Sequence, residues 1–177
     1  KDRDIAMVFQ NYALYPHMSV YDNMAFGLKL RKVPKDQIDK MVKEAAKILD
    51  LTPLLDRKPK ALSGGQRQAI TLLMAALKQP KLLLLDEHTA ALDPKTAAKV
   101  LEISDKIIAE NQLTAMMVTH NMKDAIVHGN RLIMMHEGKV IYDVAGEEKK
   151  NLQVKDLLAK FEEVSGGEFA NDRMMLA

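Results

Sequence analysis

The chain has 177 residues, of which 47% are hydrophobic and 28% are charged, and this composition excludes a disordered or low-complexity protein. The sequence contains no cysteine, which excludes disulfide bridges, cysteine-ligated metals and thiol catalysis within it. Its 26 basic and 24 acidic residues leave a net charge of +2, so we expect no nucleic-acid partner.

The first elements in chain order are a short strand and two helices. An apolar run from Ile5 to Phe9 ends at Gln10 and predicts a buried strand that enters a loop. Apolar residues then recur at helical spacing over residues 20–30 and again over 34–51. Pro34 suits the first position of the second helix.

A third helix and a strongly apolar strand follow. The helix is expected from Ser63 to Gln79, where Pro80 stops it. Residues 81–86 contain four consecutive leucines and read as a strand that is covered on both faces, as in a parallel sheet.

The second half continues the alternation of helices and strands. Asp93 and Pro94 are the residue types that cap and start a helix. The later elements are predicted, in order, to be a buried strand over 114–119, a helix over 121–128, a hairpin of strands 131–136 and 139–143, and a helix over 154–164. This alternation indicates an α/β fold with a largely parallel sheet.

Two adjacent acids follow the most apolar strand. Asp86 and Glu87 come at its carboxyl end, which is where parallel sheets bind ligands. A carboxylate at this position can hold Mg²⁺, and a second one can polarise a water molecule. Taken by themselves, the two residues are equally explained as solvated acids at the end of a strand.

A glycine pair stands at the start of the third helix. Ser63 and Gln66 have the spacing of a capping box, which is a structural feature of helix starts. A capping box does not require Gly64 and Gly65, each of which destabilises a first turn by somewhat under about 1 kcal/mol relative to alanine. Backbone N–H groups that glycines expose at a helix N-terminus suit phosphate oxygens. Capping and anion binding can therefore coexist here.

Several motifs in one order make the chain resemble the ATPase domain of ABC transporters. They are Gln10 after a strand, Leu62–Gln66 opening a helix, the strand and acids of 82–87, Ala91–Asp93, and His120 after the next strand. The resemblance covers roughly residues 5–143. It implies a P-loop NTPase-like fold with a mostly parallel sheet, helices on both faces and an inserted helical subdomain.

The resemblance also implies how the partial ATPase domain of residues 1–177 is divided. Residues 15–79 would form the helical subdomain with the signature motif. Residues 80–143 would form the core from the Walker B strand to the switch histidine, and 144–177 would form C-terminal helices and a tail.

By the same resemblance, four residues take part in the reaction of ATP. Asp86 is the Walker B aspartate that holds Mg²⁺, and Glu87 is the general base for the attacking water. His120 is the switch histidine that contacts the γ-phosphate. Gln10 is the Q-loop glutamine, which senses Mg²⁺ and the γ-phosphate and couples them to the membrane subunits.

A further group would bind nucleotide across a dimer interface. Ser63, Gly64, Gly65 and Gln66 belong to the signature that grips the ATP held by the opposite subunit, and Asp93 is the D-loop residue that crosses the interface. The implied cofactors are ATP and Mg²⁺. The implied partners are a second ATPase subunit and transmembrane permease subunits, which dock on the helical subdomain and the Q-loop. The implied location is cytoplasmic, peripheral on the inner face of the cell membrane.

One motif of the family does not occur in the sequence. No Gly-x-x-x-x-Gly-Lys-Ser/Thr is present, although this loop normally holds the ATP phosphates and precedes the Q-loop. We therefore expect the first strand and the phosphate loop of the domain to be missing. The chain would then supply the signature-side half of a composite ATP site and be inactive alone.

The two halves of the chain resemble different branches of the family. Residues 11–20 and the helices up to Arg67 are similar to sugar-importer ATPases of the maltose or multiple-sugar type. From Gln68 onward, Ala69 replaces the arginine expected after the signature, and residues 86–93 have His88 where proline is usual. This second stretch is closer to ATPases of a tryptophan or other amino-acid-type importer. These features leave three interpretations open: an importer ATPase, a mosaic of the two branches joined near the signature, and a non-catalytic folded fragment. An ABC-type ATPase of DNA repair is less favoured, because the sequence has no sustained heptads and no basic stripe.

The other histidines carry no site signal. No pair among His17, His88, His128 and His136 has a metal-ligand spacing such as His-Glu-x-x-His. We expect these four residues to be structural.

Overall fold

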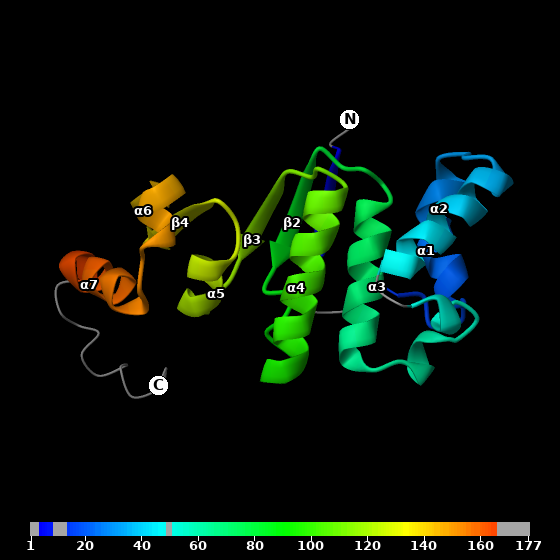
Figure 1. Ribbon diagram of the computed structural model, residues 1–177, viewed down its shortest axis with the longest axis horizontal. Helices are drawn as coiled ribbons and strands as arrows, with labels where there is room; N and C mark the ends of the chain where they lie inside the picture. Colours follow the sequence, from blue (N-terminus) through cyan, green and yellow to red (C-terminus); the bar gives the residue numbers. More distant parts are fainter. Residues whose placement is uncertain (1–3, 9–13, 49–50, 166–177) are drawn as a thin grey trace. The chain divides into compact units, whose positions relative to one another are not determined.

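The computed structural model describes residues 4–8, 14–48 and 51–165 of the chain. It consists of two compact units, Lys1–Val118 and Thr119–Ala177 (Figure 1). The first unit contains a three-stranded sheet and four α-helices, and the second contains a hairpin and three short helices, counted over the described residues. The expected α/β fold with a parallel sheet is confirmed.

The sheet of the first unit has three parallel strands in the order β1 (Ile5–Val8), β2 (Leu82–Asp86), β3 (Ala115–Val118). Ile5 pairs with Leu82 on one side of the middle strand, and Leu83 pairs with Ala115 on the other. Because all three strands run in the same direction, their carboxyl ends lie at the same end of the sheet. The acidic residues Asp86 and Glu87 lie at this end of β2.

The two faces of this sheet differ in burial. Ala6, Val8, Leu83 and Leu85 are buried, whereas the residues between them in sequence are half-buried or exposed. The prediction that residues 81–86 are covered on both faces is therefore wrong for this part of the chain. The strand predicted over 114–119 is also not buried, because β3 lies at the edge of the described sheet, with Met116 and Val118 each 51% exposed.

The first two helices follow the predicted pattern closely. Helix α1 spans Val20–Leu30, and the Ser19 hydroxyl caps it by accepting a bond of 3.0 Å from the Asp22 N–H. Helix α2 spans Lys35–Ile48, so Pro34 precedes the helix instead of occupying its first position. Leu51, predicted to end this helix, lies outside it. It instead precedes a 3₁₀ turn, Thr52–Leu54, which has Pro53 near its start.

The central helices of the unit are α3 (Gly64–Ala76) and α4 (Pro94–Glu110), which pack against each other (Figure 1). A second 3₁₀ turn, Pro59–Ala61, leads into α3. Helix α3 ends three residues before the predicted Gln79, because Gln79 has a φ of 44° ahead of Pro80. This helix contributes the largest share of the core, with eight buried residues that include Ile70, Leu72 and Leu73.

The second unit is built on an antiparallel hairpin of β4 (Arg131–His136) and β5 (Lys139–Ala145). Glu137 and Gly138 connect the strands with φ of 47° and 75°, the geometry of a tight hairpin turn, as predicted. Three helices, α5 (Met122–Val127), α6 (Gly146–Lys150) and α7 (Val154–Ser165), complete the unit. Helix α6 falls in the segment 144–177 that was expected to contain C-terminal helices, but its bounds were not predicted, since its five residues contain no apolar periodicity.

Candidate functional site

The two predicted acids lie at the carboxyl end of the middle strand of the sheet. Asp86 is the last residue of β2, and Glu87 follows it; both side chains are half-buried. Glu87 has a φ of 45°, which a residue with a side chain rarely adopts. Its N–H donates to the Val118 carbonyl at 3.0 Å, and its carbonyl accepts from the Ala90 N–H at 3.0 Å. The chain therefore turns sharply at Glu87 while staying attached to β3.

The predicted capping box is present at the start of α3. The Gln66 N–H donates to the Ser63 hydroxyl at 3.2 Å, and the Ser63 N–H donates to the Gln66 side-chain carbonyl at 3.0 Å. Ser63 is exposed, and Gly64, Gly65 and Gln66 are half-buried. The helix therefore begins at the surface of the unit with its first turn fixed.

Gly65 is also required by packing between helices. A Cβ atom built on Gly65 would lie 2.4 Å from Cγ2 of Thr96, on the first turn of α4. Ordinary van der Waals contact begins at 3.4 Å, so any side chain at this position would force the two helices or the threonine to move. The absence of a side chain lets the N-terminal turns of α3 and α4 approach one another. This close approach is a structural reason for one of the two glycines.

Asp93 caps the second of these helix ends. Its carboxylate accepts from the Thr96 N–H at 3.1 Å, as expected of a capping residue. Two hydrogen bonds lower the pKa of Asp93 below its usual value: one from the Thr96 side chain, which has the larger effect, and one from the Thr96 backbone N–H. Asp93 is exposed, so it presents a stable negative charge beside the signature turn of α3.

The remaining two site candidates do not belong to the described part of the first unit. Gln10 lies outside the described residues. His120 belongs to the second unit, where it is exposed and directly precedes Asn121, the capping residue of α5. Within the first unit, the fold brings the signature residues and Asp93 together through Gly65 and Thr96, and it keeps Asp86 and Glu87 together at the end of β2.

Sequence reasoning missed Thr96 and one contact between residues around this group. Thr96 sets the distance between the two helix starts, and no local pattern identifies it. His88 is buried and lies with its Nε2 atom 3.0 Å from the hydroxyl of Ser104 on α4. The sequence showed His88 next to the acidic pair, where the resembling family usually has proline, but it gave no indication of the contact with Ser104.

No group of three or more side chains in the described part of the chain is arranged to hold a metal ion by itself. Mg²⁺ that is bound together with a nucleotide takes one or two carboxylates and completes its shell with phosphate oxygens and water. The half-buried Asp86 carboxylate fits that need.

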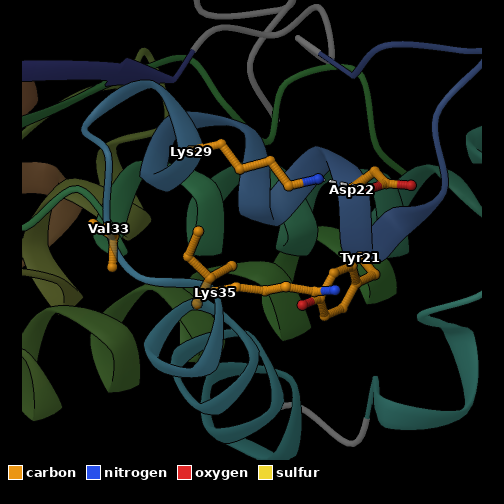
Figure 2. A pocket seen from close by; sticks show the side chains of 6 residues that line it. Tyr21, Asp22, Lys29, Val33 and Lys35 are labelled. Carbon is orange, nitrogen blue, oxygen red and sulfur yellow. Dashed lines mark hydrogen bonds and ion pairs between the residues drawn. The ribbon is translucent and has the colours of Figure 1, made fainter.

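An open depression lies away from these residues, where α1 and the start of α2 meet (Figure 2). It is lined by Tyr21, Asp22, Lys29, Val33, Lys35 and Ile38. The Lys29 ammonium pairs with the Asp22 carboxylate at 3.0 Å across one side of it. Burial and the nearby Asp39 raise the pKa of Tyr21. Basic, acidic and apolar groups therefore share this surface.

Comparison with known proteins gives a consistent result. A family model described as ABC transporter matches residues 1–90. The chain is 54% identical over 140 residues to the oligosaccharides import ATP-binding protein MsmX of Bacillus subtilis, covering 79% of this chain and 38% of that protein. It is 46% identical over 167 residues to a tyrosine transport ATP-binding protein of Clostridioides difficile, covering 89% of this chain and 66% of the relative.

A solved structure is similar over most of the chain. CbiO1 from Clostridium perfringens, part of the ABC transporter complex cbiONQ, superposes with a TM-score of 0.77 at 29% identity. The match covers 92% of this chain and 64% of that one. The chain thus spans from about two-fifths to two-thirds of the length of these proteins.

Proposed function

The chain belongs to the ABC transporter family, and we propose that it is part of the ATP-binding subunit of an importer that couples ATP hydrolysis to solute uptake. The observation that carries this proposal is the acidic pair Asp86–Glu87 at the carboxyl end of the middle strand. Parallel sheets bind ligands at the carboxyl ends of their strands. The sharp turn at Glu87 places two carboxylates there, one directly after the other.

The two acids would have different roles. Asp86 would hold Mg²⁺ together with phosphate oxygens of ATP, which is the chemistry that a single carboxylate supplies in such sites. Glu87 would accept a proton from the attacking water. The ion would neutralise charge that develops on the phosphate oxygens.

The start of α3 would act on a nucleotide held by a second subunit. Ser63, Gly64, Gly65 and Gln66 form a fixed helix N-terminus, and backbone N–H groups with the helix dipole favour phosphate there. Asp93 lies next to this turn across the contact of Gly65 with Thr96. This neighbourhood supports a role for Asp93 in the same subunit interface.

Two further residues complete the proposal by resemblance. Gln10 would sense Mg²⁺ and the γ-phosphate, and His120 would contact the γ-phosphate. Neither role is derived from geometry: Gln10 lies outside the described residues, and His120 is exposed in the second unit. The division into residues 15–79, 80–143 and 144–177 likewise stays a prediction.

The proposed partners are a second ATPase subunit and transmembrane permease subunits, and the proposed location is the inner face of the cell membrane. None of the described helices is long and apolar enough to span a bilayer. The depression lined by Tyr21, Lys29 and Lys35 lies within residues 15–79, the segment expected to dock the permease (Figure 2). Its mixture of charged and apolar groups is suited to a protein partner.

The class of solute stays open between two alternatives. The relatives include an oligosaccharide importer protein and a tyrosine transport protein, at 54% and 46% identity. Both branches were suggested by different parts of the sequence. The alternative that the chain is a mosaic rests on the different branches that its two halves resemble. The alternative that it is a folded fragment without turnover of its own rests on the absence of a phosphate-loop motif from the sequence.

The first experiment is equilibrium binding of Mg-ATP to the 177-residue chain, with ADP as the control. We expect no saturable binding up to millimolar ATP, because the sequence has no motif that holds the phosphates. Saturable binding would show that another element replaces that loop, and the composite-site proposal would be wrong.

The second experiment tests turnover after a phosphate-binding segment from a relative is joined to the N-terminus. Glu87→Gln should abolish hydrolysis and leave ATP binding intact, whereas Glu110→Gln, an exposed acid at the end of α4, should change neither. Turnover that survives Glu87→Gln would remove this residue from the role of general base.

A further inference from the structure

Glu87 adopts a backbone conformation that needs support from its surroundings. Its φ of 45° lies in the left-handed region, which glutamate disfavours on steric grounds. Two backbone hydrogen bonds hold the residue, one from its N–H to the Val118 carbonyl and one from the Ala90 N–H to its own carbonyl, both 3.0 Å. The second bond closes the turn from Glu87 to Ala90, and neither bond joins this turn to α4.

The next residue supplies that connection. His88 is only 3% exposed, and its Nε2 atom lies 3.0 Å from the Ser104 hydroxyl oxygen. Ser104 is also 3% exposed, and its hydroxyl lies 2.8 Å from the Val100 carbonyl. The side chain that follows Glu87 is thus buried and bonded to the middle of α4.

The direction of these bonds follows from the number of protons. A serine hydroxyl has one proton to donate, and the Val100 carbonyl can only accept. The Ser104 hydroxyl therefore donates to Val100 and accepts from His88. His88 carries its proton on Nε2 in this arrangement, so the chain of bonds runs from the imidazole to the serine and on to the helix backbone.

The face of α4 that accepts these bonds is held in the core. Val100, Leu101 and Ile107 are at most 4% exposed and hold the same face of α4 in the core. A histidine bound to this face cannot shift without breaking a buried hydrogen bond or moving the helix. His88 is therefore a fixed point one residue away from the proposed general base.

We propose that His88, through Ser104, is a positioning residue that holds Glu87 in its left-handed conformation and so orients its carboxylate. The importance of this orientation for hydrolysis rests on the proposed function of Glu87. A histidine that merely fills the core would contribute to overall stability without a specific effect on the turn at Glu87.

The first test is amide hydrogen exchange of the 177-residue chain, measured by NMR. His88→Ala and Ser104→Ala should each accelerate exchange at the Glu87 and Ala90 amides by about fivefold or more, the factor expected for loss of one ordinary hydrogen bond. The amide of Ile70, in the core of α3, should show no comparable change.

Three matched variants separate positioning from general destabilisation. The double variant His88→Ala/Ser104→Ala should exchange no faster at Glu87 than either single variant, because both remove the same bond. His88→Gln keeps an N–H donor at similar reach and should restore slow exchange. His17→Gln, which changes an exposed histidine, should have no effect.

Exchange at Glu87 that is unchanged in His88→Ala, or that accelerates only in step with Ile70, would overturn the proposal. Additive effects of the two single variants would overturn it as well, because the residues would then act separately.

The second test measures hydrolysis by the chain joined to a phosphate-binding segment. His88→Ala should lower kcat by about tenfold or more with little change in KM, since a misplaced base affects the transition state more than ATP binding, and His88→Gln should recover most of the rate. An unchanged kcat would contradict the positioning role. Turnover that survives Glu87→Gln would instead show that the proposed function of Glu87 is wrong, and the exchange results would still decide whether His88 supports the turn.

Discussion

Gly65 allows a quantitative test of how the signature turn is packed. In Gly65→Ala the new Cβ would lie 2.4 Å from Cγ2 of Thr96, which is 1.0 Å inside the shortest ordinary contact of 3.4 Å. Thr96 is β-branched and its side chain bonds Asp93, so its rotation is restricted. Overpacking of this kind costs about 1–3 kcal/mol.

The same substitution also has a favourable effect. Alanine is a better helix former than glycine by about 1 kcal/mol. The free energy of unfolding of Gly65→Ala should therefore fall by about 0–2 kcal/mol, the difference between the two effects. In a Thr96→Ser background the colliding methyl group is gone while the hydroxyl remains. Gly65→Ala should there raise the free energy of unfolding by up to about 1 kcal/mol.

The assay is equilibrium urea unfolding of the four members of this double-mutant cycle. The coupling between the two substitutions should be about 1–3 kcal/mol. Gly27→Ala in α1 is the matched control, because its Cβ would meet only the flexible end of Lys78 at 3.0 Å, and it should be neutral or stabilising. Equal destabilisation by Gly65→Ala in both backgrounds would show that contact with Thr96 is not the reason for glycine at this position.

Three further outcomes are expected from the same structure. Leu85 is 1% exposed, so Leu85→Ala should lower the free energy of unfolding by about 2–5 kcal/mol, whereas Leu84→Ala, at a half-buried side chain, should lower it clearly less. Equal losses of free energy in urea unfolding would contradict the burial pattern of β2. Hydrogen bonding to Arg131 lowers the pKa of Asp143, so the ion pair stabilises the hairpin at pH values above the unfolded carboxyl pKa of about 4 and loses this effect as the pH falls through the lower pKa of the folded state. Asp143→Asn should remove this pH dependence from the NMR chemical shifts of β4 and β5. Met116 and Val118 on β3 are each 51% exposed and should promote association of the isolated chain, so Met116→Glu should reduce the concentration dependence of its sedimentation coefficient. A wild-type chain that stays monomeric would refute this expectation.

Local patterns in the sequence were sufficient for most individual elements. Helix α1 has the predicted bounds, because its apolar spacing and the cap at Ser19 act within a few residues. The capping box at Ser63 and the turn at Glu137–Gly138 were likewise predictable, since both depend on backbone preferences of neighbouring residues. The acidic pair was identified by its place after an apolar strand.

Only the tertiary structure decided which residues from distant parts of the chain meet. The sequence predicted β3 to be buried, but burial depends on which strands and helices lie beside it, and β3 is at the edge of the described sheet. The contacts of Gly65 with Thr96 and of His88 with Ser104 join different elements of the fold, so no periodicity within one segment encodes them. Short-range preferences thus determined the helices, the caps and the turn, whereas packing between elements determined how the candidate site is held.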